Sequence, residues 1–139
     1  MKKKYEIIEH TADVGIKAFG KNLSDSFENA AKAMFDLITD NSEIKNIGQY
    51  NIILEAPDLE QLLVDWLSEL LFLNSSKNLV FGIFNTKIDE KNCQLNANIF
   101  GEKFSTSKHK MGIEIKAVTY HMLEVNNKSP FFVKVLFDI

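Results

Sequence analysis

Cysteine is almost missing from this chain, and long apolar runs are missing altogether. The single cysteine, Cys93, excludes an internal disulfide and a zinc site built from several cysteines. No apolar run reaches the roughly 20 residues of a membrane-spanning helix, and the first residues lack the pattern of a signal peptide. We therefore expect a protein of the reducing cytoplasm with no membrane partner. Because Cys93 alternates with Leu95 and Ala97, we predict a small core residue rather than a nucleophile.

An excess of basic residues is also missing. The chain has 16 Lys and Arg residues against 19 Asp and Glu residues, so its net charge is −3. Apart from the run at residues 2–4 the lysines are scattered, and no strong direct binding of nucleic acid is expected. The sequence contains no Ser–His–Asp spacing, CxxC, HExxH or glycine-rich phosphate loop, and no evident Lys or Arg cluster for a phosphate. These absences argue against an enzyme.

The composition that remains is that of a globular protein. The 139 residues suit one domain, 1–139, and apolar residues make up 45% of them, an ordinary proportion for a soluble domain. Two amphipathic helices are predicted: one over residues 23–40 with Ser24 as N-cap, and one that begins after Asp58 with a capping-box-like partner at Gln61. The second helix carries an apolar stripe that we expect in the core: Leu59, Leu62, Leu63, Trp66, Leu67, Leu70 and Leu71.

Alternation of apolar residues predicts strands in most of the remaining chain. The expected strands cover residues 4–8, 15–20, 49–56, 79–89, 93–101, 113–125 and 131–139. Two helices interspersed among these strands and several hairpins predict an α+β fold. In this fold the two helices pack on a largely antiparallel or mixed sheet.

Candidate functional residues lie in the polar segment from Glu9 to Asp13, where the first hairpin turns. This segment is too polar for the core, and Asp13 precedes the apolar residues of the second strand directly. We predict that His10 orients the segment through a hydrogen bond, with metal ligation as the alternative. Of the other histidines, His121 shares the parity of its apolar neighbours and is predicted in the core. His109 lies in a polar, lysine-rich segment and is predicted to be exposed.

The closing residues place further carboxylates one residue apart, at Asp138 and at the end of the chain, Ile139. Asp138 has the parity of Lys134, which indicates a partly solvated strand face. Two negative charges about 4 Å apart repel by roughly 4 kcal/mol at an effective dielectric near 20, so we expect either a nearby cation or side chains that point into water. Together with Asp13 they would form the all-oxygen cage that hard divalent cations prefer. Spacing alone does not show whether these ends meet.

Five segments of the chain, in order, resemble the archease family, whose members are accessory proteins of RtcB-type tRNA-splicing ligases. They are EHTADVGIKAFG, DLEQLLVDWLSELL, GEKF…KH, IKAVTYHMLEV and VLFDI. Each segment alone is a weak signal, but the five in register make the match specific, and it extends from Tyr5 to Ile139. The resemblance implies a strand–helix–strand–strand unit that is elaborated into a sheet with two helices.

The resemblance also implies a metal site and a partner. In the family a divalent cation, assigned as calcium, is held by residues that correspond to Asp13, Asp138 and Ile139, the last through its α-carboxylate or backbone oxygen. All-oxygen ligation also permits magnesium or manganese. The implied role is non-catalytic: an archease promotes guanylylation of the active-site His of the ligase, restores its turnover and broadens the nucleotides that it uses. GTP is handled on the ligase, which joins RNA ends in tRNA splicing or RNA repair.

Two other functions are compatible with the residues. A stand-alone metal-dependent phosphoesterase would use Asp13, Asp138 and the terminal carboxylate, but neither a general base nor a phosphate-binding cluster is evident. A general chaperone or interaction module would need no metal, and substitution of Asp13 would leave its function intact.

Overall fold

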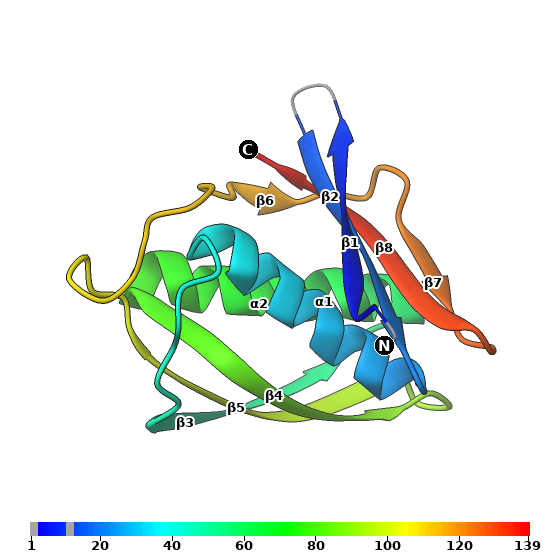
Figure 1. Cartoon of the computed structure of the whole chain (residues 1–139). Helices are drawn as coiled ribbons and strands as arrows, with labels where there is room; N and C mark the ends of the chain where they lie inside the picture. Colours follow the sequence, from blue (N-terminus) through cyan, green and yellow to red (C-terminus); the bar gives the residue numbers. More distant parts are fainter. Residues whose placement is uncertain (1–2, 11–12) are drawn as a thin grey trace.

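The two helices lie between two antiparallel sheets in the computed structural model, which describes residues 3–10 and 13–139 (Figure 1). The first sheet has the order β1–β2–β8–β6, with β7 also paired to β8, and its strands are β1 (Tyr5–His10), β2 (Asp13–Gly20), β6 (Ala117–Val118), β7 (Glu124–Asn126) and β8 (Phe131–Asp138). The second has the order β3–β5–β4, and its strands are β3 (Gly48–Glu55), β4 (Leu79–Asp89) and β5 (Gln94–Lys103). The predicted α+β class is confirmed, with the strands divided between two sheets.

Helix α1 (Leu23–Ile38) is tied to β4 at its first turn. Its N-cap is Asn22, whose Oδ1 accepts a hydrogen bond from the main-chain N–H of Asp25 at 2.8 Å. The predicted cap, Ser24, is wrong: it lies in the first turn, and its Oγ accepts from the N–H of Ile88 at 3.2 Å. Both residue types cap helices, but only one position can face the open N–H groups.

Helix α2 (Leu59–Lys77) follows its sequence pattern closely. The predicted cap is confirmed, because Asp58 Oδ1 accepts from the N–H of Gln61 at 2.8 Å. The predicted apolar stripe is buried except at Leu59, which is partly buried. From this stripe the indole N–H of Trp66 donates to the carbonyl oxygen of Phe27 at 3.0 Å, so a core side chain joins the two helices. Within the described residues, neither helix is long and apolar enough to cross a membrane.

Aromatic rings fill the space between the helices and the second sheet. Phe35 of α1 meets the Phe81 ring edge-on at 5.6 Å and stacks on Phe84 at 5.9 Å between ring centroids. Trp66 of α2 contacts the same Phe84 ring edge-on at 6.2 Å. Burial of each such side chain contributes about 1.5–3 kcal/mol, so this cluster anchors β4 to both helices.

The predicted strand over residues 113–125 is wrong, because only β6 and β7 form there. The main chain before β6 follows the end of α1 instead: the N–H groups of Gly112 and Ile113 donate to the carbonyl oxygens of Ile38 and Leu37, each at 2.9 Å. Between β6 and β7 the chain turns, with Met122 at a φ of 56°. The alternation of apolar residues in this segment therefore reflects contacts with a helix end as well as a sheet.

Cys93 is also placed differently from the prediction. It lies in the turn between β4 and β5 with a φ of 49°, and it is partly buried. The alternating apolar residues begin only after it, at Leu95, which is buried in β5.

Candidate functional site: a carboxylate pair at the edge of the first sheet

The structure brings the first polar segment and the closing segment together. Strand β2 begins at Asp13, β8 ends at Asp138, and these two residues are direct partners in the antiparallel ladder. Side chains of such partners leave the sheet on the same face, with Cβ atoms about 4.5–5.5 Å apart. Asp138 is exposed and Asp13 is half-buried. Two carboxylates that are 125 positions apart in the sequence thus share one place on the surface.

The two other residues predicted near this site lie in the same region. Ile139 follows Asp138 directly and is 40% exposed, and the chain ends beside the β1–β2 hairpin (Figure 1). His10 is the ladder partner of Asp13 on the other side, in β1. The side chain of His10 lies outside the described residues, and its roles as orienter or ligand remain predictions.

An apolar pair lies next to the aspartates on the same face of the sheet. Gly15 is the ladder partner of Leu136, and the Leu136 side chain, 1% exposed, occupies the space over the glycine. A Cβ atom at Gly15 would lie 2.3 Å from Leu136 Cδ2 and 2.9 Å from the carbonyl oxygen of Val135. Glycine is therefore required here. The buried leucine thus lies two residues from Asp138 on the same face of the sheet.

The next charged pair on this face consists of two lysines, one of which contacts an aromatic ring. Lys17 and Lys134 are ladder partners, four residues from the aspartates along each strand, which corresponds to about 13 Å. Lys17 Nζ lies 4.4 Å from the centroid of the Phe132 ring, a cation–π contact. The charges on this face are thus separated along the strands, with aspartates at one end and lysines further along.

Strand β6 holds the main chain of Asp138 from its other side. Ala117 is the ladder partner of Asp138, and the N–H of Lys116 donates to the Asp138 carbonyl oxygen at 2.7 Å. The carboxylate of Asp138 remains at the surface while its backbone is fixed between two strands. The pair therefore sits on rigid elements, which favours a binding site of defined geometry.

The donors at this edge fit a hard cation. Two carboxylates and the main-chain oxygen of Ile139 form an oxygen-only set, which suits calcium, magnesium or manganese rather than zinc or copper. The described residues contain no group of three or more His, Cys, Asp and Glu side chains that could hold a metal. The two aspartates would therefore need a further ligand, and the Ile139 oxygen is the predicted one, with His10 as the alternative. Like charges directly opposite in a ladder destabilise it by roughly 0.2–1 kcal/mol, which a bound cation would offset.

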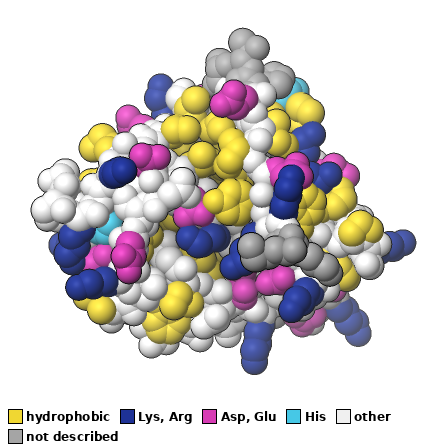
Figure 2. Space-filling model, in the orientation of Figure 1, with side chains coloured by type: hydrophobic (Ala, Val, Ile, Leu, Met, Phe, Trp, Pro, Cys, Tyr) yellow, Lys and Arg dark blue, Asp and Glu magenta, His cyan; other side chains and the backbone are white. Residues whose placement is uncertain are grey.

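The surface around the pair is rich in apolar side chains. Figure 2 shows them gathered on the upper part of the face, where β6 and the chain end lie in Figure 1. Exposed apolar residues include Ile139 at the chain end, at 40%, and Tyr120 and Met122 in the connection from β6 to β7, at 61% and 47%. Contiguous exposed apolar surface is typical of protein interaction sites.

The remaining histidines lie where the sequence did not predict them. His121 is exposed, in the turn between β6 and β7, because the segment is not a continuous strand. His109 is only 4% exposed and stacks on the Phe104 ring at 5.4 Å. Its Nδ1 accepts from the N–H of Ser105 at 2.9 Å and so carries no proton, which leaves the N–H on Nε2.

That Nε2–H is directed at Glu102, the centre of a second cluster that sequence reasoning missed. Glu102, 8% exposed, accepts from His109 Nε2 at 2.9 Å, from the N–H of Lys45 at 2.8 Å and from Lys108 Nζ at 3.1 Å. These bonds, that from Lys45 above all, lower the pKa of the Glu102 carboxyl to about 2 although burial opposes the shift. We call Glu102, His109, Lys108 and the Lys45 N–H the Glu102 cluster. It joins three chain segments and its bonds are satisfied internally, as expected of a structural element.

These features define a class: a small α+β protein of two sheets and two helices with an oxygen-donor site at one sheet edge. The model of the Archease protein family (MTH1598/TM1083) matches residues 5–139. The chain belongs to the archease family.

Individual relatives agree along nearly the whole chain. The archease of Sulfurisphaera tokodaii is 41% identical over 130 residues, 94% of each chain. The archease of Methanosarcina mazei is 44% identical over 126 residues, 88% of this chain and 86% of its own length. Among solved structures, the solution structure of Methanobacterium thermoautotrophicum protein 1598 superposes with a TM-score of 0.83 at 35% identity, and covers 98% of this chain and 99% of its own.

Proposed function

We propose that this protein is a non-catalytic activator of an RtcB-type RNA ligase, and that it binds a divalent cation through Asp13, Asp138 and Ile139. In this proposal it promotes guanylylation of the active-site His of the ligase, restores multiple turnover and broadens nucleotide use. The GTP consumed in guanylylation is handled on the ligase rather than on this chain, and the protein acts in the cytoplasm, in tRNA splicing or RNA repair.

One observation carries the proposal: the register that makes Asp13 and Asp138 direct partners. Ladder pairing holds the two carboxylates on one face at a separation that a single ion can bridge. Each residue has a defined part. The aspartates and an Ile139 oxygen bind the cation, and the Lys116 N–H fixes the main chain of Asp138.

The cation, when bound, would offset negative charge on the nucleotide phosphates of the partner. The exposed apolar residues beside the site, Tyr120, Met122 and Ile139, would form the contact with the ligase. A binding role of this kind needs no nucleophile and no general base on this chain. It also suits a protein with a net charge of −3 better than direct RNA binding does.

The test is a guanylylation assay that contains the cognate ligase, GTP and manganese, with the covalent guanylylate followed in time. The wild-type protein is expected to accelerate guanylylation at substoichiometric amounts. Asp13→Asn and Asp138→Asn are each expected to reduce this acceleration at least tenfold, because each removes one charged oxygen ligand. Asp40→Asn is the matched control: it removes the same charge from an exposed residue in a turn and should leave the acceleration unchanged.

Residues added after Ile139 give a second variant of the site, since they would convert a terminal carboxylate into an amide. We expect this extension to weaken activation with little loss of thermal stability. Equal activity with and without the extension would remove Ile139 from the ligand set. Hydrolysis of generic phosphoesters by the isolated protein, lost in Asp13→Asn, would replace the activator proposal with a phosphoesterase.

A further inference from the structure

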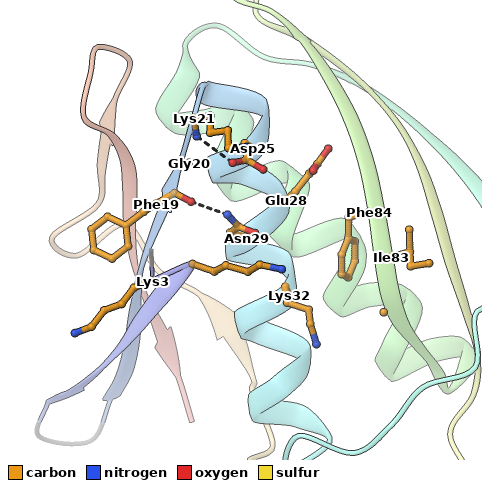
Figure 3. Close-up of a pocket in the computed structure, with 12 residues that line it drawn as sticks. Lys3, Phe19, Gly20, Lys21, Asp25, Glu28, Asn29, Lys32, Ile83 and Phe84 are labelled. Atoms are coloured by element: carbon orange, nitrogen blue, oxygen red, sulfur yellow. Dashed lines mark hydrogen bonds between the residues drawn. The ribbon is translucent and has the colours of Figure 1, made fainter. Parts of the chain in front are cut away.

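A pocket of about 490 Å³ lies at the other end of β2 from Asp13 (Figure 3). It is lined by the residues that precede β1, the end of β2 at Phe19 and Gly20, helix α1 as far as Lys32 and β4 around Ile83. Seven residue steps along β2 separate Gly20 from Asp13, which corresponds to about 23 Å. The pocket is therefore separate from the carboxylate pair.

Positive charge is concentrated in this pocket. Four lysines line it, Lys3, Lys4, Lys21 and Lys32, against two carboxylates, in a chain whose net charge is −3. The sequence shows only part of this cluster, the run at residues 2–4, because Lys21 comes from the β2–α1 connection and Lys32 from the middle of the helix. The fold alone brings them to one place.

The two carboxylates of the pocket are bound to the protein itself. Asp25 Oδ2 accepts from the main-chain N–H of Lys21 at 3.0 Å, a bond drawn in Figure 3. Glu28 Oε2 accepts from the N–H and the hydroxyl of Thr86 at 2.7 and 3.1 Å, so this carboxylate is directed at β4. Burial raises the pKa of the Glu28 carboxyl above its ordinary value. Neither acid therefore forms a side-chain ion pair with a pocket lysine within the described residues.

Two of the lysines are available to an anion. The other two already have acidic partners: Lys32 Nζ lies 2.8 Å from Asp36 Oδ1, and Lys3 Nζ lies 3.5 Å from Glu6 in an exposed pair. Among residues 3–10 and 13–139, Lys4 and Lys21 take part in no ion pair, and both are exposed. Lys21 also precedes α1 by two residues, where the helix dipole adds to the positive potential.

The β4 side of the pocket is apolar. Ile83 is 43% exposed and lies with Phe84 on this side in Figure 3, whereas the labelled lysines come from the β1, β2 and α1 side. The ladder register shifts between Phe81 and Ile83, at Gly82, and such a bulge re-aims the side chains that follow it. The pocket thus combines a cationic side with an apolar wall.

We propose that this pocket binds a polyphosphate chain of the kind that a nucleoside triphosphate carries. Lysine ammonium groups bind phosphate as point charges. Lys4 and Lys21 are the main ligands, and Lys3 and Lys32, which already pair with carboxylates, contribute less. The volume lies within the range of small-ligand sites, about 300–1,000 Å³. The nucleoside would contact Ile83. This site is independent of the divalent cation and of the ligase.

The experiment is calorimetric titration of the full chain in metal-free buffer of low ionic strength, with inorganic tripolyphosphate, ATP and a short single-stranded RNA as separate ligands. Saturable 1:1 binding of tripolyphosphate and ATP is expected, weakened by salt. Lys4→Ala/Lys21→Ala should lower both affinities at least tenfold. The matched control, Lys87→Ala/Lys91→Ala, removes the same charge from exposed positions outside the pocket and should change them less than twofold.

The ligands separate the possible sources of the phosphate. If ATP binds at least threefold tighter than tripolyphosphate, and Ile83→Ser removes this difference, the site is a nucleotide site. If the two affinities are equal, the site recognises the polyphosphate chain alone and Ile83 has no role. No saturable binding, an equal loss in the control variant, or RNA bound tighter than ATP would overturn the proposal. Asp13→Asn, which alters the proposed cation site, should bind ATP with the same affinity as the wild type. Failure of the pocket proposal can therefore be distinguished from failure of the proposed ligase activation.

Discussion

Two groups of charged residues in this protein differ in how their charges are arranged. Glu102 is buried at 8% exposure, and it accepts hydrogen bonds from Lys45, Lys108 and His109. Asp13 and Asp138 instead place two like charges opposite each other at a surface edge of a sheet. The first arrangement lowers the energy of the folded chain by itself, whereas in the second the repulsion between the two carboxylates opposes folding and a bound cation would offset it.

The difference separates a carboxylate with a structural role from the carboxylates of the proposed cation site. A buried carboxylate with three donors from its own chain holds segments in place and has no need of a ligand. A pair of like charges in register contributes no such stabilisation by itself, and the cation of the proposed site would offset the repulsion between the two carboxylates. Substitutions in the two groups should therefore have opposite effects on the free energy of unfolding.

The largest expected effect is that of Glu102→Ala, which should lower the free energy of unfolding by roughly 3 kcal/mol at pH 7. The change leaves the N–H of Lys45 and the buried Nε2–H of His109 without their acceptor, and a buried unsatisfied group costs about 1–3 kcal/mol. Urea denaturation followed by circular dichroism measures it. Glu114→Ala, at an exposed position, should change the stability by less than about 0.5 kcal/mol, as surface substitutions do.

The same variant has a pH signature. The pKa of Glu102 is lowered from 4.5 to about 2 in the folded protein, so its contribution is present above pH 4.5 and is lost as the pH falls toward 2. The stability gap between the wild type and Glu102→Ala should therefore narrow over this range. A gap that stays constant from neutral pH down to about 2 would contradict the role of the ionised carboxylate.

An intermediate effect is expected for Gly15→Ala, about 2 kcal/mol of destabilisation. The new Cβ would lie 2.3 Å from Leu136 Cδ2 and 2.9 Å from the Val135 carbonyl oxygen, and overpacking of this kind costs about 1–3 kcal/mol. Thermal unfolding measures it. At Gly48 the nearest atom to a built Cβ is 3.3 Å away, so Gly48→Ala should cost less; equal costs would mean that Leu136 moves freely aside.

The smallest effect on the metal-free protein is expected for Asp138→Asn. Relief of the like-charge pair should raise the free energy of unfolding by up to about 0.5 kcal/mol. With calcium the wild type should become the more stable of the two proteins. At a calcium concentration of about one hundred times the dissociation constant, binding stabilises the wild type by about 2.7 kcal/mol, and the variant should lose most of this gain. Titration of thermal stability with calcium, magnesium and manganese measures both. An equal metal-dependent gain in both proteins would exclude Asp138 as a ligand.

Local signals allowed the helices to be predicted from the sequence. Helix α2 is defined by contacts between residues three and four apart and by a cap whose donor is three residues away, so Asp58 and the stripe around Trp66 were visible without the fold. The hairpin of β4 and β5 was visible for the same reason, although its turn extends to Cys93. The segment before β8 was not, because its main chain bonds to the distant end of α1.

Long-range partners limited the prediction of the sites. The residue types of the carboxylate pair were identified through the family resemblance, but the ladder register that joins Asp13 to Asp138 depends on packing of the whole sheet. The burial of His109 could not be foreseen, since the Glu102 carboxylate that receives its N–H also binds Lys45, 57 residues earlier. The lysine pocket was missed because its cations are dispersed along the first 32 residues.

The bond from Trp66 to Phe27 has a practical consequence. Trp66 is the one tryptophan of the chain, it is fully buried, and its indole joins the two helices. Its fluorescence emission is therefore an intrinsic reporter of global unfolding, and a shift to longer wavelength should mark the opening of the helix layer. The carboxylate edge lies on the surface and Trp66 is fully buried, so cation titrations at constant temperature should leave the emission maximum unchanged.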